Sequence, residues 1–224
     1  MLDRILTEHP EVEFVQIALN YIDWESEFVQ AKECYEVIRR HGKQVVIMEP
    51  VKGGGLAKVP ESVEKALKEM DPAASVVSWA VRFAGSMEGA ICNLSGMSTL
   101  EQVKENIRTV KNLNPLSEEE RQKLHEIVKL YKDAGPIGSD LSRYRGLTLH
   151  GAPVTGILEA YNMCQLQPDP GYSDDNNYLK NVIAEKAHLD CFGELPEEKV
   201  ILPDGTDVTE EVVKAEQWLI KHSF

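Results

Sequence analysis

The sequence predicts an α/β fold in which parallel strands alternate with helices, in a layered or barrel arrangement. Between residues 12 and 110, apolar segments of strand length alternate three times with segments of helical periodicity. In this pattern a helix follows each strand and leads the chain to the next parallel strand. Functional residues are therefore expected at the C-terminal ends of the strands.

Charge and composition exclude two classes of partner. With 24 basic and 37 acidic residues, the net charge is −13, and no run of basic residues is visible. A chain of this charge repels nucleic acids and anionic membrane surfaces. Its 224 residues and 42% hydrophobic content are enough for a sizeable core. We therefore expect a folded protein with neither a nucleic-acid nor a membrane partner.

The N-terminus and the cysteines indicate the cellular compartment. No apolar run approaches the roughly 20 residues that span a bilayer, and residues 1–14 lack the apolar core of a signal peptide. The cysteines are far apart and form no CxxC pair, which predicts buried, reduced thiols and no disulfide, iron–sulfur or zinc site. They are Cys34, Cys92, Cys164 and Cys191. The sequence thus predicts a cytoplasmic protein.

The chain opens on a helix and then a strand. Apolar residues at helical spacing predict a helix over residues 2–8. Pro10 breaks this helix, and residues 12–19 then have the continuous apolar character of a buried strand. Because no strand precedes the first helix, the alternation indicates that the front of the fold is missing.

The second helix and strand lead into a glycine-rich loop. Residues 25–40 carry an apolar stripe, and Gly42 ends this helix. Residues 44–50 are predicted to form a second buried strand, which is β-branched and uncharged until Glu49. The three glycines of residues 52–55 serve either as a flexible turn or as a close approach to a ligand. The stripe of the helix consists of Phe28, Ala31, Cys34, Tyr35 and Ile38.

A third unit of strand, loop and helix follows two further helices. Residues 95–98 form the loop, and the helix begins at Thr99 or Ser98, either of which can form a capping box with the residue three positions later. Its apolar residues recur at helical spacing, which predicts one buried face. That face consists of Leu100, Val103, Ile107 and Val110. The preceding helices and strand are predicted over residues 61–70, 73–84 and 90–94.

This third unit has the features of a phosphate site. The first turn of the helix has unpaired backbone N–H groups and the positive end of the helix dipole, and Gly96 lies in the loop before it. Units of this kind are common in α/β folds, and most bind nothing. A purely structural role therefore remains the alternative.

The regular alternation stops near residue 135. We expect a first domain over residues 1–134, which ends with a helix, and a loop-rich, helical extension over residues 135–224. Residues 174–177, Asp-Asp-Asn-Asn, lack the glycine and distal glutamate of a calcium loop, so we expect a solvated loop without a metal. Helices are predicted over residues 117–133, 154–164 and 209–221, a polar loop over 167–179 and a turn over 203–205.

Three segments resemble consecutive parts of a known family. They are FVQIALNY, VVIMEPVKGGGLA and ICNLSGMSTLEQVKENI. In this order and at these separations, they resemble the last three strand–loop units of the aldo/keto reductase family, particularly its bacterial branch. The resemblance covers about residues 1–130 and is strongest in GMSTLEQVKEN. It implies a partial (β/α)8 TIM barrel that binds NADP(H) without a Rossmann domain and reduces a small aldehyde or ketone to an alcohol by hydride transfer.

The resemblance also implies a cofactor-binding role for residues at the three strand ends. Gln16 matches a glutamine that hydrogen-bonds the nicotinamide amide, and Glu49 stands where many relatives have a tyrosine that stacks on the ring. The glycine loop matches the segment around the pyrophosphate, and the loop before the last helix matches the 2′-phosphate site. Gln102 and Asn106 match positions at the adenine end. The full set is Gln16, Glu49, Pro50, Val51, Gly53, Gly54, Gly55, Gly96, Met97, Ser98, Thr99, Gln102 and Asn106.

Two parts of the family pattern are missing. The basic partner of the 2′-phosphate does not occur in residues 96–98, although Lys104 and Arg108 follow nearby, so NADP is preferred over NAD only by resemblance. The catalytic aspartate, tyrosine, lysine and histidine of the family come from its first four strands, none of which this chain contains. The sequence therefore offers cofactor-binding residues and no catalytic ones.

We accordingly expect the C-terminal portion of a reductase, from a truncated or divided reading frame, which is inactive alone. Three strands of eight leave two unpaired edges and an uncovered apolar face, which favours pairing with the missing N-terminal half or with another copy. The alternative is a non-catalytic nucleotide-binding or interaction module derived from the same half-barrel. A small α/β hydrolase or isomerase has no support, because the GxSxG motif is absent.

Overall fold

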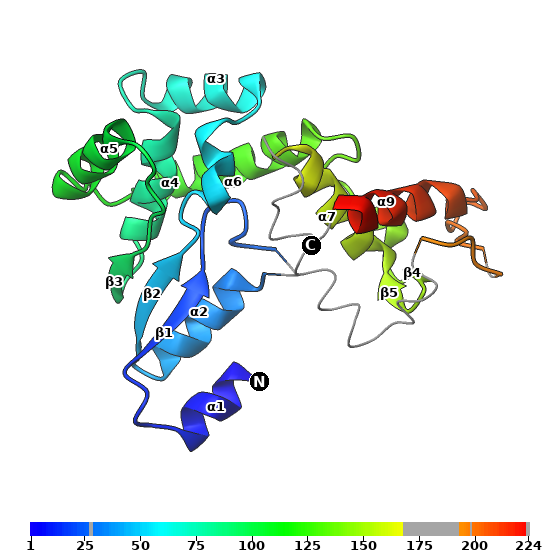
Figure 1. The fold of residues 1–224 in the computed structure, drawn as a ribbon, viewed down its shortest axis with the longest axis horizontal. Coiled ribbons are helices and arrows are strands. Elements are labelled where there is room, and N and C mark those ends of the chain that lie inside the picture. Colours follow the sequence, from blue (N-terminus) through cyan, green and yellow to red (C-terminus); the bar gives the residue numbers. More distant parts are fainter. Residues whose placement is uncertain (27–28, 168–192, 198, 223–224) are drawn as a thin grey trace. The chain divides into compact units, whose positions relative to one another are not determined.

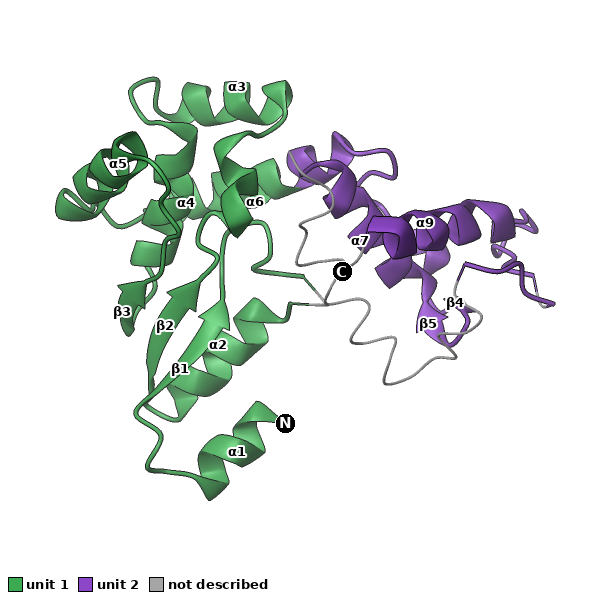
Figure 2. Cartoon of the chain, viewed as in Figure 1, with its two compact units in different colours: residues 1–128 green, residues 129–224 purple. Residues whose placement is uncertain are grey.

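The computed structural model of the chain describes residues 1–26, 29–167, 193–197 and 199–222. The chain divides into two compact units, residues 1–128 and residues 129–224, and the division falls within helix α6 (Glu118–Asp133) (Figures 1 and 2). The first unit contains a parallel sheet, and the described part of the second is mainly helical. Within the described residues, no helix is long and apolar enough to cross a bilayer.

A parallel sheet of three strands organises the first unit, with strand order β1-β2-β3 (Figure 1). The strands are β1 (Phe14–Ala18), β2 (Gln44–Met48) and β3 (Ala90–Asn93). The first pair is in register throughout, whereas the pairing of β2 with β3 shifts after Val45. The predicted α/β alternation with parallel strands is confirmed.

Helices connect these strands and pack against them. Helix α2 contacts β1 and β2, and α4 contacts β3 and α5. Two helices begin later than predicted: Gln30, with φ of 52°, precedes α2, and the Ser75 side chain accepts the Ser78 N–H to cap α4. Phe28, predicted within the second helix, lies outside the described residues. The helices are α1 (Leu2–Glu8), α2 (Ala31–Arg40), α3 (Glu61–Met70), α4 (Val76–Gly85) and α5 (Leu100–Lys111).

Only the central strand is buried. Val45 and Ile47 of β2 are each 0% exposed, as predicted for a buried strand. The prediction that residues 12–19 form a buried strand is wrong for β1, because none of its five residues is buried and Phe14 is 49% exposed. The physical reason is position: within the described sheet, β1 has a neighbour on one side only.

The apolar face of α5 is exposed, which contradicts the prediction that it is buried. Leu100, Ile107 and Val110 are 61%, 57% and 52% exposed, and no residue of α5 is buried. Helical periodicity identified the face correctly, but no described element covers it. Cys92 of β3 is exposed too, against the prediction of buried thiols, whereas Cys164 is buried.

The second unit combines a short hairpin with helices. Its strands β4 (Thr148–Leu149) and β5 (Ala152–Pro153) pair antiparallel across a two-residue turn, in which His150 and Gly151 have φ of 49° and 81°. This hairpin was not predicted. The two predicted helices are confirmed as α7 (Val154–Gln165) and α9 (Thr209–His222), which pack on each other. The predicted polar loop, including residues 174–177, lies outside the described residues from 168 onward.

A carboxylate is buried in the second unit. Glu216 of α9 has a fully buried side chain, whose Oε2 lies 2.9 Å from His150 Nδ1 and accepts the Gly193 N–H at 2.9 Å. Burial raises the pKa of Glu216, and the two hydrogen bonds partly oppose this rise. We infer a structural role for this contact, because it joins α9 to the hairpin turn.

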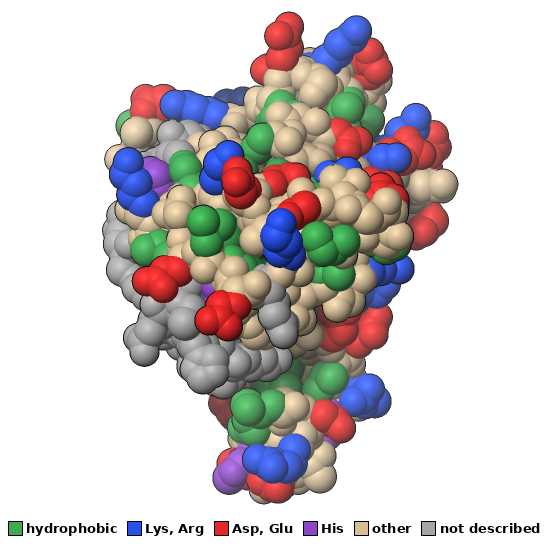
Figure 3. Space-filling model, turned by 90° about the vertical axis from the view of Figure 1, so that its right-hand side faces the viewer, with side chains coloured by type: hydrophobic (Ala, Val, Ile, Leu, Met, Phe, Trp, Pro, Cys, Tyr) green, Lys and Arg blue, Asp and Glu red, His purple; other side chains and the backbone are tan. Residues whose placement is uncertain are grey.

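Acidic and basic side chains are both exposed at the surface. On the face drawn in Figure 3, acidic and basic side chains are interspersed, with hydrophobic side chains in small groups between them. Exposed ion pairs such as Lys199–Asp207 and Arg40–Asp3 contribute little to stability because solvent screens them. Stability therefore depends mainly on the two cores.

Candidate functional site

A cavity of 610 Å³ lies where β2 and β3 end. Its size is typical of small-molecule sites, which are about 300–1,000 Å³. Residues 48–57, which are the last residue of β2 and the segment after it, form what we call the first wall. Residues 94–106, which include the start of α5, form the second wall. The C-terminal ends of parallel strands are the expected place for such a site.

The first wall has an unusual backbone. Glu49 and Lys52 have φ of 57° and 48°, in the left-handed region that non-glycine residues rarely adopt. Gly53 and Gly54 follow with φ of 59° and 95°. Hydrogen bonds to the Val51 carbonyl from Gly54 N and Leu56 N close the loop into a short 3-10 segment, η1 (Lys52–Ala57). The loop therefore forms a hydrogen-bonded turn with a defined backbone.

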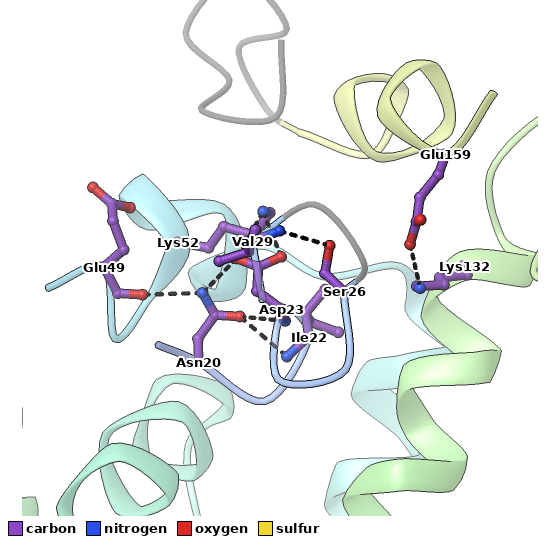
Figure 4. A network of polar contacts seen from close by, with 9 residues as sticks. All are labelled: Asn20, Ile22, Asp23, Ser26, Val29, Glu49, Lys52, Lys132 and Glu159. Carbon is purple, nitrogen blue, oxygen red and sulfur yellow. Dashed lines mark hydrogen bonds and ion pairs between the residues drawn. The ribbon is translucent and has the colours of Figure 1, made fainter. Parts of the chain in front are cut away.

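Asn20 joins the end of β1 to the first wall (Figure 4). Its Oδ1 accepts the N–H groups of Ile22 and Asp23 at 3.1 and 2.9 Å. Its Nδ2 donates to Asp23 Oδ2 at 2.8 Å and to the Glu49 carbonyl at 3.1 Å. Asn20 is fully buried, so these bonds satisfy a side chain that has no access to water.

Lys52 and Asp23 form a buried ion pair beside Asn20 (Figure 4). Lys52 Nζ lies 2.8 Å from Asp23 Oδ1 and 2.9 Å from Oδ2, and the side chains are only 5% and 7% exposed. Each charge compensates the desolvation of the other. The lysine of the glycine-rich loop therefore points into the protein and does not line the cavity.

The second wall is organised by a capping box at the start of α5. The Thr99 hydroxyl accepts the Gln102 N–H at 3.3 Å, and Gln102 Oε1 accepts the N–H groups of Ser98 and Thr99 at 2.8 and 3.2 Å. Asn106 Nδ2 donates to Ser95 Oγ at 2.9 Å, one turn further along. The predicted capping box is confirmed, and Thr99 rather than Ser98 is the cap.

Most of the predicted cofactor residues meet at this cavity. Gln16 does not line it; it is exposed on β1, and its Nε2 lies 3.3 Å from Sδ of the lining residue Met48. Gly55 belongs to the first wall but is buried and does not line the cavity, and Thr99 contributes through the capping box. The predicted residues that line the cavity are Glu49, Pro50, Val51, Gly53, Gly54, Gly96, Met97, Ser98, Gln102 and Asn106.

Some lining residues were not predicted. Glu105 follows Gln102 by three positions, and helical spacing places it on the same side of α5, so the sequence carried a usable signal. Val77 comes from α4, which has no motif, and only the tertiary structure brings it to the cavity. The others are Met48, Ala57, Leu94 and Ser95.

The charge of the cavity lining is negative. Among the described residues, its ionisable side chains are those of Glu49 and Glu105, and no lysine or arginine lines it. Neither Lys104 nor Arg108, the basic residues near the second wall, is in the lining, and Arg108 lines a separate cavity. Anion binding here would depend on backbone N–H groups, hydroxyls and the α5 dipole.

Comparison with solved structures gives partial matches to this chain. Two similar solved structures are an aldo-keto reductase from Bacillus halodurans in its apo form, with 20% identity and TM-score 0.44, and in its holo form, with 21% and 0.43. Each match covers 56% of this chain and 47% or 46% of the reductase. The chain thus spans about half the length of these relatives. A search of curated proteins gives no match.

The family model extends over the whole first unit. The model of the aldo/keto reductase family matches residues 2–129, which is more than half of the chain. The matched region ends where the first compact unit ends. It contains both walls of the cavity and all three strands of the parallel sheet. The chain belongs to the aldo/keto reductase family.

Proposed function

We propose that the first unit is the cofactor-binding half of an NADP(H)-dependent oxidoreductase that reduces aldehydes or ketones. The observation that carries the proposal is the cavity at the ends of β2 and β3, lined by ten residues that family resemblance assigns to the cofactor. The remaining strands of a (β/α)8 barrel and the catalytic residues would come from sequence that this chain does not contain.

The residues of the cavity fit a dinucleotide in two ways. A Cβ atom at Gly54 or Gly96 would meet no atom within 4 Å, so the backbone there faces open space that a phosphate can approach. In the first turn of α5, the N–H groups of Leu100 and Glu101 have no carbonyl partner within the helix. These donors and the helix dipole would hold phosphate oxygens, while Met48 and Met97 supply apolar contacts to a base.

In this proposal the chain binds and orients the cofactor. The nicotinamide supplies a hydride for a carbonyl carbon when the cofactor is bound. Gln16 would orient the nicotinamide amide from the middle of β1, and Gln102 and Asn106 would contact the adenine end from α5. The proton for the carbonyl oxygen would come from a residue outside this chain.

A second candidate function is a non-catalytic nucleotide-binding module. The observation that favours it is the cavity lining, whose described residues include no tyrosine, histidine or lysine to donate a proton. The purified chain, assayed with NADPH and an aldehyde, should give no reduction under either proposal. Addition of a matching N-terminal half should restore reduction only if the chain is half of an enzyme.

The open faces of the first unit support a protein partner. The outer strands β1 and β3 each pair with β2 alone within the described sheet, and Ile91 of β3 is 53% exposed. The exposed apolar face of α5 lies on the helix after β3. We propose that a complementary strand–helix half, or a second copy, covers these surfaces. Sedimentation velocity of the chain alone and with that half tests this directly.

Cofactor binding is the primary test. The chain is titrated with NADPH and, separately, with NADH, and binding is followed by nicotinamide fluorescence. We expect Gly96→Leu, which fills the cavity, to weaken NADPH binding about tenfold or more, a change of about 1.4 kcal/mol. Lys58→Leu, at an exposed residue outside the lining, should leave binding unchanged. If neither dinucleotide binds, alone or with the N-terminal half, the proposed function is wrong.

A further inference from the structure

The first wall is held at two points, and both holding groups come from the segment that follows β1. Asn20 Nδ2 donates to the Glu49 carbonyl at 3.1 Å, and Asp23 pairs with Lys52 Nζ at 2.8 Å. Pro50 and Val51 lie between these points and line the cavity. Asn20, Asp23 and Lys52 do not line it. The network therefore acts on the shape of the wall and not on the contents of the cavity.

The two holding points coincide with the two strained residues. Glu49 and Lys52 are the non-glycine residues of the wall with left-handed backbone, at φ of 57° and 48°. Such conformations persist only where the surrounding structure fixes them. The hydrogen bond reaches the carbonyl of Glu49 itself, and the ion pair reaches the side chain of Lys52 itself (Figure 4). This coincidence identifies what fixes them.

We propose that Asn20, Asp23 and Lys52 are positioning residues that keep the first wall in the shape that accepts the cofactor. The identity of the ligand rests on the proposed function, whereas the effect on the wall does not. Without the network, residues 49–52 relax to ordinary backbone angles, and the fraction of molecules with a competent wall falls. The apparent affinity falls by the same factor.

This role differs from direct contact between Lys52 and a phosphate. If Lys52 bound the 2′-phosphate, its removal would weaken the binding of NADPH and leave the binding of NADH unchanged, because NADH lacks that group. A lysine that contacted the pyrophosphate, which both dinucleotides carry, would weaken the binding of both on removal but would leave hydrogen exchange of the ligand-free wall unchanged. A lysine that shapes the wall weakens the binding of both by the same factor and also changes that exchange. Lys52 Nζ lies beside Asp23 in the interior, which favours the wall-shaping role.

The binding test compares Lys52→Met, the double variant Asp23→Asn/Lys52→Met, and the matched control Lys58→Met at an exposed lysine. The double variant removes both buried charges, so urea unfolding should show stability closer to the parent than for Lys52→Met. In both variants, the binding of NADPH and the binding of NADH should weaken by the same factor. This factor is about tenfold if about a tenth of the molecules keep the wall in the shape that accepts the cofactor. Parent affinity in the double variant, or a loss confined to NADPH, overturns the proposal.

Hydrogen exchange tests the wall without any ligand. In both variants we expect the amides of residues 51–56 to exchange about tenfold faster, as for a segment whose local opening becomes easier, while those of residues 100–106 keep their rates. Unchanged exchange at residues 51–56 overturns the positioning role even if the dinucleotide binds. If the parent chain binds neither dinucleotide but exchange responds as expected, the proposed function fails and the positioning role stands.

Discussion

The two walls of the cavity are built in opposite ways. The first wall is fixed from behind by Asn20, Asp23 and Lys52, all buried, in contacts that join positions 29 apart in sequence. The second wall is fixed within itself by the Thr99–Gln102 capping box, whose residues are exposed and three positions apart. One wall depends on the tertiary fold, and the other depends on a single helix terminus.

This difference teaches where each wall is vulnerable. A buried network leaves orphaned polar groups when one member is lost, and such losses are costly. An exposed cap can be replaced by water, so its loss is cheaper. We expect substitutions in the first wall to affect stability more than equivalent substitutions in the second.

The largest effect is expected at Asn20. Asn20→Ala should lower the free energy of unfolding by about 3 kcal/mol, because the buried N–H groups of Ile22 and Asp23 lose their acceptor and each loss costs about 1–3 kcal/mol. Urea denaturation followed by circular dichroism measures the change. The control Asn112→Ala removes an exposed side chain bonded to a helical carbonyl and should cost less than about 0.5 kcal/mol. Equal costs at both sites would show that the buried bonds of Asn20 stabilise the fold no more than an exposed side-chain bond does.

A glycine from each wall gives the next largest difference. At Gly54 and at Gly96, a methyl group added to the Cα would meet no atom within 4 Å, but Gly54 alone has a positive φ, of 95°. Gly54→Ala should therefore cost about 1–2 kcal/mol through backbone strain. Gly96→Ala should cost nothing or stabilise by about 0.4–1 kcal/mol, because it restricts the unfolded chain. Thermal unfolding of the pair measures this, and a costly Gly96→Ala would show strain in the second wall too.

Loss of the cap is expected to cost about 1 kcal/mol. Thr99→Ala removes the acceptor of the Gln102 N–H, an exposed bond of 3.3 Å, and caps of this kind contribute about 0.5–2 kcal/mol. Thr109→Ala is the control in the same helix, where the hydroxyl bonds the Glu105 carbonyl and alanine is a better helix former. Urea denaturation should show a loss for the first variant only. A cost above that of Asn20→Ala would reverse the order of the two walls.

The smallest effect is expected on the outer face of the second wall. Leu100 is 61% exposed, so Leu100→Ser should change the free energy of unfolding by less than about 0.5 kcal/mol. Leu67→Ser, at a leucine of α3 that is 1% exposed, should cost more than about 2 kcal/mol. Parallel urea denaturation curves give both values. A large loss of stability in Leu100→Ser would mean that a partner already covers α5 in solution.

Signals between residues close in sequence were enough to predict the second wall. They gave only part of the first wall. The capping box involves residues three apart, so the sequence alone places the start of α5 within a residue of Thr99, and the structure selects Thr99 over Ser98 as the cap. The glycines marked the first wall, but nothing in the sequence connected Lys52 to Asp23. The ion pair depends on the parallel pairing of β1 with β2, which aligns the two strand ends. Tertiary pairing of this kind is invisible to periodicity.

Periodicity also failed to predict burial. The apolar patterns of β1 and α5 correctly identified a strand and an amphipathic helix. Whether such a face is buried depends on another element to cover it, and periodicity within one segment says nothing about its neighbour. The burial of β2 was predicted correctly because this chain also contains both strands that flank it, β1 and β3.

The order of the strands in the sheet follows their order in the chain. Each strand of the described sheet therefore lies beside the strand that precedes it in the chain, as in a repeat array, and no strand lies inserted between two consecutive ones. Within the described sheet, both outer positions stay available for further units of strand and helix. Such a unit can join beside β1 or beside β3 without displacing a strand that has already formed, so the sheet can be extended in modules from either end.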